Sequence, residues 1–500
     1  MVSVGSNVAW WSRATPQREA MVYDGKSVTF AVLQGRMEVV AGMLRRRGIC
    51  PGDVVAVLMK NSAAFLEVSL AVSHVAAVLL PINYRLGAEE VAYIATHAGV
   101  QLMFVDDELL EAVPPDLPAI VCDRAAQADS SLLAPGDAAL VTPHASIADD
   151  LYRLMYTSGT TDRPKGVMHT YANMAWKCLD HITALNLNPD DRLLVAGPLY
   201  HVGAHDLPGV AVWMAGGCLV IERDFDADAV LKRIGEQKIT GVWLAPVMLT
   251  RCLEQAQTGN YDLTSLRWVI GGGERTPEQR IRTFAEVFPK ARYIDAYGLT
   301  ESCSGDTLME AGREIEKIGS TGRVLPHVSV RIVDDGGEVS PAGKIGEICL
   351  SGPKITPGYW KDPEKTSASF SGAWFHTGDM GYLDEEGFLF LTDRKKDMII
   401  SGGENIASSE VERVLYGMPQ IQEVAAIGLP DSKWGECVTA VVVLREGNSL
   451  TLEEIREYCK GRLGGFKLPR KLIICESLPR NPSGKILKRQ LRAIQHDRDE

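Results

Sequence analysis

Segments with strand-like and helix-like patterns alternate along the first 395 residues, and this alternation limits the possible folds more than any other feature. Thr29 to Arg47 has the apolar spacing of an amphipathic helix that ends at Gly48, and Asp53 to Met59 is a short apolar run typical of a strand. The alternation continues through a strand at 193–196, a helix at 226–235, a strand at 240–244, a helix at 246–257 and a strand at 266–270. This rhythm predicts an α/β fold with parallel sheets covered by helices, in which ligands bind at the carboxyl ends of the strands.

The pattern changes near residue 330. Short alternating strands between Gly and Pro turns are expected at 328–333, 347–351 and 387–391, which predicts a small antiparallel β subdomain over about 330–395, such as a small barrel. The charged run from Asp393 to Asp397 follows; we place a domain boundary at Lys396, although such a run also suits an ordinary surface turn. The remaining residues are expected to form an α+β domain, with helices at 407–416, 452–463 and 485–495 and strands at 423–428, 438–444 and 471–475.

The composition is that of a soluble globular protein. The chain has 500 residues, 46% hydrophobic and 23% charged, which is too long for a single core. Its net charge of −12 argues against nucleic-acid binding, because phosphate contacts need a basic face. Ten cysteines are scattered without a C-x-x-C pair, so neither a zinc site nor a disulfide framework is predicted, and reduced thiols fit the cytoplasm.

Two segments bear on targeting and membranes. Met1 to Trp10 lacks a basic region and an apolar core, so no signal peptide is expected. Ala63 to Pro81 is rich in Ala, Val and Leu, but Glu67 and His74 interrupt it. A helix followed by a buried strand is therefore expected there rather than a transmembrane segment.

A loop rich in hydroxyls and glycine, Y-T-S-G-T-T-D-R-P-K-G, spans Tyr156 to Gly166. Backbone N–H groups of a Gly-containing turn, hydroxyls and one ammonium suit a polyphosphate. The spacing from Gly159 to Lys165 matches the phosphate loop G-x-x-x-x-G-K-[ST], but Pro164 and Gly166 replace its second glycine and its metal-binding hydroxyl. The segment is therefore a phosphate loop of another kind, or else a polar turn, because these residues are also common in turns.

Six further motifs follow this loop in order. They are Pro198-Leu199-Tyr200-His201, Tyr293 to Glu301 (Y-I-D-A-Y-G-L-T-E), Trp374 to Asp379 (W-F-H-T-G-D), Asp393-Arg394, Ser401 to Asn405 (S-G-G-E-N) and Asn481 to Lys485 (N-P-S-G-K). With the loop, this series resembles the adenylate-forming superfamily, which contains acyl-CoA synthetases, 4-coumarate–CoA ligases, firefly luciferase and peptide-synthetase adenylation domains. The motifs cover residues 156–485, and weaker similarity covers nearly the whole chain. The resemblance implies that a carboxylate and ATP react to give an acyl-adenylate and pyrophosphate.

The resemblance assigns the triphosphate and the metal to two of these motifs. Two anions meet in the reaction, so cations and oriented N–H dipoles have to offset their repulsion. Glu301 would hold Mg²⁺, a hard cation that prefers oxygen ligands, and Thr300 would contact the α-phosphate. The alternative for Glu301 is a carboxylate that merely favours a helix N-terminus. The β- and γ-phosphates would be held by Thr157, Ser158, Gly159, Thr160, Thr161 and Lys165.

Other motifs would hold the nucleoside. Asp379 would accept hydrogen bonds from both ribose hydroxyls with Arg394 in support, although an aspartate in T-G-D also suits a turn. Tyr297 would stack on adenine, unless it is an ordinary core tyrosine. The adenine edge would be lined by Gly272, Gly273, Glu274, Asp295 and Ala296.

Lys485, in the turn P-S-G-K, is the residue that the resemblance implies for adenylate formation. Its ammonium would bridge the carboxylate and the α-phosphate, and such donors typically contribute ~10²–10³ in rate. Transfer to the thiol of CoA would then follow rotation of a mobile C-terminal domain about Lys396. The predicted domains are therefore 1–395, which binds AMP, and 396–500, the lid.

CoA has a weaker signature. Ser401, Gly402 and Gly403 would border the pantetheine channel, where missing side chains let a narrow thiol arm pass. Trp434 and the segment with Phe466 and Lys467 resemble the surface that meets the CoA nucleotide, because an aromatic and cations suit adenine and phosphate. A strand-edge loop with solvated basic residues is the alternative for that segment.

By the same resemblance, residues near position 200 would form the site that binds the acid. His201 would lie at the mouth of the acyl pocket, unless it is a satisfied core histidine. Amino-acid adenylating enzymes usually place an aspartate after this aromatic to hold the amine, and Tyr200 to Gly203 offers none. The pocket would be lined by Tyr200, Val202, Gly203, His205, Trp243, Val247, Gly271 and Cys303, each of which would otherwise be ordinary core.

Two features depart from the family pattern. Asp162 stands where glycine is usual in the phosphate loop. Aspartate tolerates positive φ, but its carboxylate would repel a triphosphate unless it points outward or meets Arg163, so an altered ATP affinity is expected. Arg275 and Ala296 replace the commoner proline and glycine, which leaves the details of the adenine edge open.

The sequence thus predicts an ATP-dependent carboxylic acid–CoA ligase that uses ATP, Mg²⁺ and CoA. Its acid is expected to be apolar, either a fatty acid or an aryl acid of the cinnamate type. No nucleic-acid partner and no transmembrane segment are expected, and the oligomeric state is open, a homodimer being one option. Three alternatives remain: a stand-alone adenylation enzyme that loads a carrier-protein thiol, a luciferase-like oxygenase and a catalytically silent nucleotide-binding module.

Overall fold

The computed structural model describes residues 3–122, 144, 146–157, 163–272, 276, 278–394, 397–401, 404–431, 433–480 and 486–499. The chain divides into two compact units, Met1–Val330 with Leu350–Phe375 and Arg331–Cys349 with His376–Glu500. The predicted boundary at Lys396 lies outside the described residues and stays a prediction. Within the described ranges, no helix combines the length and apolar character that crossing a bilayer requires.

One sheet of the first unit has, in its described residues, the strand order β6-β5-β3-β4-β7-β8. β3 pairs in parallel with β4 and β5, and β7 and β8 form an antiparallel hairpin at the edge. Every residue of β3 is buried, as expected of a strand covered on both faces. The elements of this layer are β3 (Val54–Leu58), β4 (Val78–Pro81), β5 (Val100–Asp106), β6 (Ala119–Cys122), β7 (Leu151–Thr157), β8 (Lys165–Thr170), α1 (Val4–Ala14), α2 (Phe30–Arg46), α3 (Ala63–His74), α4 (Ala88–Ala98) and η1 (Asp107–Ala112).

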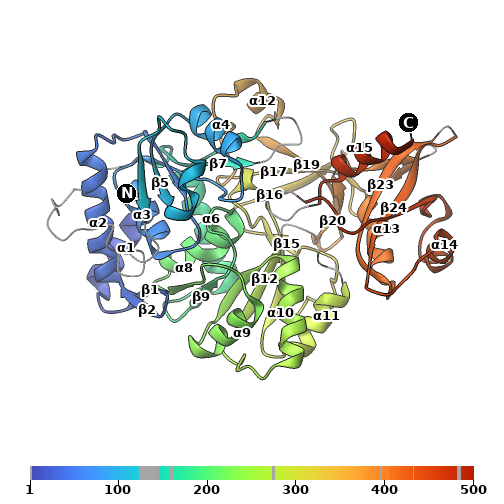
Figure 1. Cartoon of the computed structure of the whole chain (residues 1–500), viewed down its shortest axis with the longest axis horizontal. Helices are drawn as coiled ribbons and strands as arrows, with labels where there is room; N and C mark the ends of the chain where they lie inside the picture. The colour runs from blue at the N-terminus through green and yellow to red at the C-terminus, as the bar shows by residue number, and fades with distance from the viewer. Residues whose placement is uncertain are drawn as a thin grey trace. The chain divides into compact units, whose positions relative to one another are not determined.

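A second sheet of this unit runs in the order β15-β14-β13-β12-β11-β9-β10-β1-β2. Its pairs from β1·β10 to β12·β13 are parallel, and only the edge strands β2, β14 and β15 pair antiparallel among the described residues. The helices α9, α10 and α11 lie side by side along this sheet (Figure 1). The strands are β1 (Glu19–Tyr23), β2 (Lys26–Thr29), β9 (Arg192–Val195), β10 (Cys218–Ile221), β11 (Gly241–Leu244), β12 (Trp268–Gly272), β13 (Arg292–Tyr297), β14 (Thr307–Leu308) and β15 (Arg323–Val324). The remaining helices of the unit are α6 (Tyr171–Leu185), α7 (Val202–Ala204), η2 (His205–Gly209), α8 (Val210–Met214), α9 (Ala227–Glu236), α10 (Pro246–Thr258), α11 (Glu278–Val287), η3 (Thr300–Ser302) and α12 (Pro363–Ala368).

Four adjacent parallel strands of the second sheet end at one edge. β9, β11, β12 and β13 are consecutive neighbours, so the segments that follow them lie together. β9 leads toward His201, β12 ends at Gly272 and β13 ends at Tyr297, just before Glu301. The carboxyl ends of these parallel strands thus carry Gly272, Tyr297 and the segment that leads to His201, at the edge where ligands bind in sheets of this kind.

A smaller sheet has the order β16-β17-β19-β18, with β20 paired to β19. β19 is antiparallel to both β18 and β20, which confirms the predicted antiparallel subdomain. The described strands form an open sheet rather than a small barrel. Their bounds are β16 (Ser329–Val333), β17 (Gly346–Ser351), β18 (Phe370–Ser371), β19 (Trp374–Leu383) and β20 (Leu389–Arg394).

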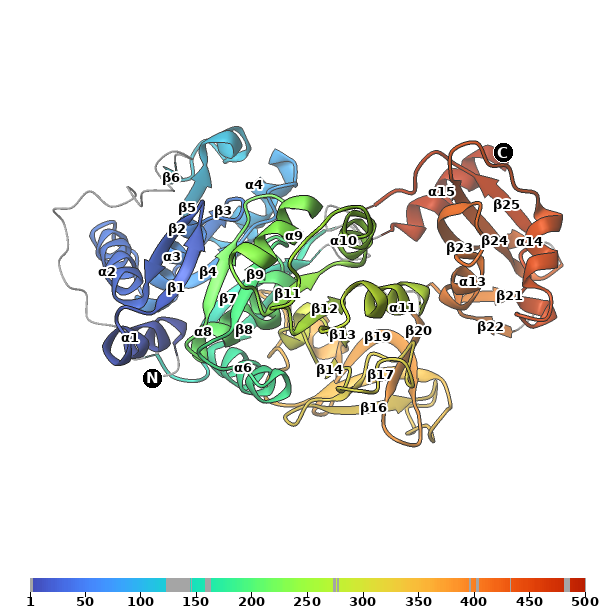
Figure 2. The ribbon, with the colours of Figure 1, turned by 90° about the horizontal axis from the view of Figure 1, so that it is seen from below.

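The C-terminal part of the second unit is built on a sheet in the order β22-β21-β24-β23, with β25 paired to β24. β23 and β24 form a long antiparallel pair, and Figure 2 shows α13, α14 and α15 around them. A buried cluster that includes Val411 of α13, Val438 of β24 and Ile455 of α14 forms its core. The elements are β21 (Ile399–Ser401), β22 (Glu404–Ile406), α13 (Ser408–Leu415), β23 (Ile421–Asp431), β24 (Gly435–Leu444), α14 (Leu452–Cys459), η4 (Gly465–Lys467), β25 (Lys471–Ile474) and α15 (Lys488–Asp499).

The predicted helices and strands are present in the structure, and where their ends differ from the predicted ones the backbone shows why. The apolar run at 63–81 is the buried helix α3 followed by β4, as expected. The helix predicted at 452–463 stops at Cys459, because Lys460 has extended backbone angles and Gly461 has a left-handed φ of 74°. The strand predicted at 423–428 extends over Ile421–Asp431, because β24 pairs with it along that whole length.

Candidate active site

The two ends of the predicted phosphate loop lie on the paired strands β7 and β8. Thr157 and Lys165 are cross-strand partners, so the hairpin brings the two ends of the loop together. The side-chain oxygen of Thr157 is buried and has no hydrogen-bond partner among the described residues. A hydroxyl and an ammonium thus flank the loop, as the polyphosphate prediction requires.

Helix α4 holds both ends of this loop. His97 Nδ1 lies 2.6 Å from Tyr156 Oη, and Tyr93 Oη donates a hydrogen bond to the Pro164 carbonyl at 3.3 Å. The guanidinium carbon of Arg163 lies 5.2 Å from the centre of the Tyr93 ring. Arg163 is therefore already engaged in a cation–π contact.

A cation, a phenol and a carboxylate meet beside the loop. Lys165 Nζ donates to Tyr359 Oη at 3.0 Å, and Tyr359 Oη donates to Glu301 Oε1 at 2.9 Å. Lys165 Nζ also lies 3.6 Å from the same carboxylate oxygen. The Lys165 and Glu301 side chains remain 25% and 13% exposed, so a charged ligand can reach both.

Burial sets the protonation of this trio. Desolvation lowers the pKa of Lys165, and the nearby Glu301 charge opposes that shift. Desolvation and then the Glu301 charge raise the pKa of Tyr359 well above its ordinary value. Tyr359 therefore remains a phenol that accepts a hydrogen bond from Lys165 and donates one to Glu301.

Tyr359 is a site residue that the sequence reasoning missed. Trp360 N donates to the Gly166 carbonyl at 2.8 Å, and Thr356 N donates to the Glu301 carbonyl at 2.7 Å. These backbone bonds tie the segment that carries Tyr359 to both β8 and η3. The aromatic pair Tyr359-Trp360 directly after a Pro-Gly turn is the signal that could have found it.

The described residues predicted for the adenine edge, Gly272, Asp295 and Ala296, lie on the neighbouring strands β12 and β13. Gly271 is in register with Asp295, and Gly272 is in register with Ala296. A Cβ atom added to Gly272 would lie 2.9 Å from the Ala296 carbonyl oxygen, so a side chain there would force the backbone apart. Asp295 and Tyr297 are buried beside them.

Trp243 fills a slot at the predicted acyl pocket. A Cβ atom added to either Gly197 or Gly203 would lie 2.5 Å from the indole ring, so both glycines are needed to admit it. The His201 ring stacks near Trp243, with centroids 6.0 Å apart and planes at 29°. Three of the predicted residues, His201, Gly203 and Trp243, are therefore brought together.

His201 has a defined tautomer. Its Nδ1 accepts a hydrogen bond from Gly203 N at 3.0 Å. Burial lowers the pKa of the ring below its usual value, so the imidazole is neutral. Because Nδ1 accepts, the single ring proton lies on Nε2 and is available as a donor.

The other predicted pocket residues differ in environment. Val202 and Cys303 are buried, and burial raises the pKa of the Cys303 thiol to about 12. Tyr200 Oη has no hydrogen-bond partner in the described part of the chain, and burial raises its pKa to about 12. Val247, on the first turn of α10, is 54% exposed. His205 belongs to a buried ionic network described below.

In the second unit, the two predicted ribose ligands lie opposite each other. Asp379 of β19 and Arg394 of β20 are cross-strand partners. Gly378 has a left-handed φ of 72°, and Asp379 N donates to Thr377 Oγ1 at 3.0 Å. The T-G-D turn therefore exists and presents Asp379 beside Arg394 on the sheet.

The predicted CoA residues of this unit fall into two groups. Ser401 is in register with Gly435, the residue after Trp434. The Trp434 ring is flanked by Arg470 and Lys433, whose charged groups lie 4.4 Å and 5.0 Å from its centre. Trp434 therefore lies between two cations, of which Lys433 was not singled out from the sequence.

The second group is differently arranged. Phe466 is 43% exposed, with Lys467 Nζ at 5.5 Å from its ring centre. Lys467 Nζ also forms an ion pair with Glu410 at 2.6 Å. Its charge is therefore already compensated within the unit.

Several predicted residues lie outside the described part of the chain. They are Ser158, Gly159, Thr160, Thr161, Asp162, Gly273, Glu274, Arg275, Lys396, Gly402, Gly403 and Lys485. Their assigned roles stay predictions.

The chemistry of the donors fits a magnesium ion held mainly by a nucleotide. The described residues contain no group of three His, Cys, Asp or Glu side chains arranged to hold a metal. Glu301 offers one partly exposed carboxylate. Mg²⁺ is commonly bound by one or two carboxylates plus substrate phosphates, so a lone carboxylate beside a phosphate loop is suitable.

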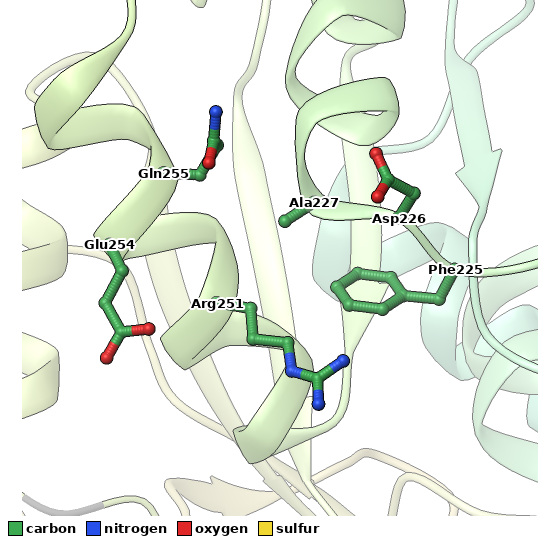
Figure 3. A pocket seen from close by; sticks show the side chains of 6 residues that line it. All are labelled: Phe225, Asp226, Ala227, Arg251, Glu254 and Gln255. Carbon is green, nitrogen blue, oxygen red and sulfur yellow. The ribbon is translucent and has the colours of Figure 1, made fainter. Parts of the chain in front are cut away.

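A surface hollow of about 350 Å³ lies elsewhere in the first unit (Figure 3). It is lined by residues at the start of α9 and on α10, among them Asp226, Arg251 and Glu254. None of the predicted site residues lines it. The hollow is therefore separate from the site built here.

Comparisons with known proteins identify the family. The sequence model of the AMP-binding enzyme family matches residues 8–360, and that of the AMP-binding enzyme C-terminal domain matches residues 410–485. The chain is 36% identical over 482 residues to a feruloyl-CoA synthase from an Amycolatopsis species, which covers 96% of each chain. It is also 36% identical over 498 residues to the long-chain-fatty-acid–CoA ligase FadD13 of Mycobacterium tuberculosis, covering 97% of this chain and 98% of the relative.

A solved structure gives the same result. The o-succinylbenzoate CoA synthetase (MenE) from Bacillus subtilis, in complex with ATP and magnesium ion, aligns with a TM-score of 0.87 and 30% identity. The alignment covers 97% of this chain and 98% of that one. The resemblance drawn from the motifs is therefore confirmed, and the chain belongs to the AMP-binding enzyme family, the adenylate-forming superfamily that includes the acyl-CoA synthetases.

Proposed function

We propose that the protein is an ATP-dependent carboxylic acid–CoA ligase that acts on an apolar aryl or fatty acid. ATP and the acid first give an acyl-adenylate and pyrophosphate, and the thiol of CoA then displaces AMP to form the thioester. The chain belongs to the AMP-binding enzyme family, and relatives in it are named as a CoA synthase and a CoA ligase. Relatives named for feruloyl-CoA and for long-chain fatty acids match this chain equally well, which supports an apolar acid of either kind.

The contact between Lys165, Tyr359 and Glu301 carries this proposal. Lys165 supplies positive charge for the β- and γ-phosphates, and Glu301 supplies the hard oxygen that Mg²⁺ prefers. When bound, the metal ion would neutralise charge on the phosphate oxygens. Tyr359 joins the two groups and holds the free enzyme close to the arrangement that ATP requires.

The nucleoside would be held by the residues that the motifs assign to it. Gly272 and Ala296 offer a flat edge without bulky side chains, and Tyr297 offers an aromatic face. Asp379, with Arg394 opposite it, would accept hydrogen bonds from the ribose hydroxyls. We keep these assignments as proposals that rest on register and residue type.

Lys485 would supply the charge that adenylate formation needs. The attacking carboxylate and the α-phosphate are both anionic, and an ammonium between them stabilises the transition state. CoA transfer has no such requirement for a cation. The proposed rotation about Lys396 would remove Lys485 between the two steps.

The acid would be oriented by His201. Its neutral ring carries the proton on Nε2, and this N–H suits the carboxylate of an incoming acid. Trp243 and the His201 ring offer stacked flat surfaces to an aromatic acid. The buried Tyr200 hydroxyl offers a polar group without a described partner.

CoA remains the proposed thiol. The Trp434 ring with Arg470 and Lys433 suits an adenine and phosphates. Ser401 pairs with Gly435, the residue that follows Trp434. A carrier-protein thiol would not need this surface. Exchange of CoA for a phosphopantetheine-loaded carrier protein decides between the two acceptors.

A reducing location fits the thiols. None of the ten cysteines forms a disulfide, although the chain holds enough of them for several. We therefore propose that the protein works in the cytoplasm. Cell fractionation, with the protein recovered in the soluble cytosolic fraction, tests this.

An acid panel tests the proposed function. The protein is incubated with ATP, Mg²⁺, CoA and one acid at a time: ferulate, 4-coumarate, indoleacetate, and fatty acids of increasing length. Pyrophosphate release that depends on the acid, with an acyl-CoA detected by mass spectrometry, supports the proposal. Hydrolysis of ATP to ADP, or no dependence on any acid, contradicts it.

A further inference from the structure

A buried chain of polar side chains lies beneath the phosphate hairpin. Arg153 of β7 and His169 of β8 are cross-strand partners in the hairpin stem. Arg153 Nε donates to His169 Nδ1 at 3.0 Å, and its guanidinium forms a two-pronged ion pair with Asp206. His169 Nε2 lies 2.6 Å from the Thr300 carbonyl oxygen. Arg153, His169 and Asp206 are fully buried.

These contacts fix the tautomer of His169. An arginine N–H can only donate, so Nδ1 of His169 has to accept and the ring proton lies on Nε2. Burial, and then the Arg153 charge, lower the pKa of His169 to about 3, so the ring is neutral near pH 7. The Nε2–H therefore donates to the Thr300 carbonyl.

Asp206 holds Arg153 in this arrangement. Burial alone would raise the pKa of Asp206, but the Arg153 charge and its hydrogen bonds hold it well below the usual range. Asp206 lies in η2, the segment that follows His201, and His205 Nδ1 lies 2.8 Å from its carboxylate. The ion pair thus connects the segment after His201 to the stem of the phosphate hairpin.

The Thr300 carbonyl lies in a short turn. η3 contains only Thr300–Ser302, and Cys303 after it has a left-handed φ of 56°. Within this turn, the Thr300 carbonyl accepts one backbone bond, from Cys303 N at 3.1 Å. The bond from His169 is the second, and it comes from the hairpin that carries Lys165.

We propose that Asp206, Arg153 and His169 are positioning residues for adenylate formation. They fix the Thr300–Glu301 turn relative to the hairpin, so that the carboxylate of Glu301 and the ammonium of Lys165 keep the spacing that ATP with its metal needs. This inference rests on the proposed function, because it assigns that spacing to the binding of ATP. None of the three positioning residues touches the reacting atoms.

If Asp206, Arg153 and His169 only stabilised the fold, their substitution would have other effects than those expected of positioning residues. If the network only stabilised the fold, its loss would lower both half-reactions and the melting temperature together. If it positions Glu301, its loss would act on the step that uses ATP and magnesium. The thioester step starts from a preformed acyl-adenylate and has no pyrophosphate or magnesium to place, so it would change little.

The experiment compares two substitutions of His169 in the full chain. His169→Leu removes the donor to Thr300, whereas His169→Gln keeps an N–H near the position of Nε2. ATP–pyrophosphate exchange measures the first half-reaction, and thioester formation from supplied acyl-adenylate and CoA measures the second. His74→Leu is the matched control, because His74 is also buried but lies in α3, away from the site.

The expected results follow from loss of one buried hydrogen bond. His169→Leu should lower kcat/KM for ATP in the exchange reaction by about 10- to 100-fold and raise the magnesium requirement, while thioester formation changes less than about threefold. His169→Gln should recover most of the exchange activity. His74→Leu should change the melting temperature but leave the ratio of the two half-reactions as in the wild type.

Three outcomes would overturn the inference. They are equal loss in both half-reactions for His169→Leu, equal behaviour of His169→Leu and His169→Gln, or unchanged exchange in His169→Leu. Failure of the wild type to catalyse exchange with any acid would instead contradict the proposed function itself.

A measurement on the wild type does not depend on the activity of any variant. In the ¹⁵N spectrum of histidine-labelled protein, the His169 ring, like that of His201, should be neutral with its proton on Nε2 and should not titrate between pH 5 and 9. The His169 signal is assigned by its loss in a sample with His169→Gln, or by its transfer to the Thr300 carbonyl across the hydrogen bond. A His169 ring that titrates near pH 6.5, or that carries its proton on Nδ1, overturns the inference.

Discussion

Tyr359→Phe removes one hydroxyl and keeps the ring that lies against Lys165. The hydroxyl makes two hydrogen bonds to ionised groups, one from Lys165 at 3.0 Å and one to Glu301 at 2.9 Å. A hydrogen bond to a charged group contributes about 1.5–3 kcal/mol. Deletion of the hydroxyl should therefore loosen the arrangement of Lys165 and Glu301 before ATP binds.

The full free energy of these hydrogen bonds is not expected to be lost, for two reasons. Lys165 Nζ and Glu301 Oε1 lie 3.6 Å apart and can still attract each other directly. Their side chains are 25% and 13% exposed, so water recovers part of the lost interaction. We expect a net effect of about 1–2 kcal/mol, or about 5- to 30-fold in kcat/KM for ATP in pyrophosphate exchange.

Tyr261→Phe is the matched control for this prediction. Tyr261 Oη donates to the Asp228 carboxylate at 2.7 Å and accepts from Gln255 at 2.8 Å, away from the site. Tyr261→Phe should leave exchange within about twofold of the wild type. If Tyr359→Phe behaves like Tyr261→Phe in exchange, the assignment of Tyr359 to the ATP site is wrong.

Four further predictions concern other parts of the enzyme. Lys485→Ala should abolish adenylate formation yet leave thioester formation from supplied acyl-adenylate largely intact; equal loss in the two assays would refute its role. Gly402→Leu should do the reverse by obstructing the thiol channel, and normal CoA transfer would refute that placement. Trp243→Leu should raise kcat/KM for bulkier acids by about tenfold or more relative to smaller ones, because it opens the slot at Gly203, and an unchanged preference across the acid panel would refute it. Asp206→Asn should lower the free energy of unfolding by about 3–5 kcal/mol at pH 7, because it leaves a buried Arg153 unpaired. Because the pKa of Asp206 is lower in the folded than in the unfolded state, the stability that Asp206 contributes is complete above about pH 4 and is lost as the pH falls toward the folded pKa. Urea unfolding of the wild type and Asp206→Asn as a function of pH measures this loss of stability and its pH dependence. A difference in stability between the two proteins that shrinks at higher pH would contradict the prediction.

The sequence predicted the layers of the first unit well, because the signals for them are local. The apolar spacing of Thr29 to Arg47 became α2, and Thr29 caps it by accepting a hydrogen bond from Val32 N. The segment from Tyr156 to Gly166 was singled out by its glycines and hydroxyls, but the hairpin formed by β7 and β8 was not predicted. Register in the sheet then brought Gly272 and Ala296 together without any signal that either residue gives alone.

Residues that act through distant contacts could not be predicted in this way. Tyr359 donates to Glu301 across 58 positions of the chain, and Arg153 pairs with Asp206 across 53. Neither pair has a fixed spacing that a sequence pattern can reveal. A lone arginine in a strand pattern is ordinarily a surface residue, and only the tertiary fold shows that Arg153 is buried and paired.

The solvent exposure of individual side chains could also not be predicted from the sequence. Val247 was expected to line the acyl pocket because it follows a strand and is apolar, yet its side chain is 54% exposed on the first turn of α10. The side of a helix that faces a ligand depends on how the helix meets the sheet. In contrast, Trp243 is held in place by two glycines, and that arrangement appears only when Gly197, Gly203 and β11 are seen together.

The most direct test of the account follows the fate of ATP. The purified enzyme is given ATP labelled in the α-phosphate, Mg²⁺, CoA and an acid that is active in the panel, and the products are separated. The account predicts AMP and acyl-CoA in a one-to-one ratio, with acyl-adenylate accumulating when CoA is withheld. Formation of labelled ADP, or of acyl-CoA without AMP, would contradict it.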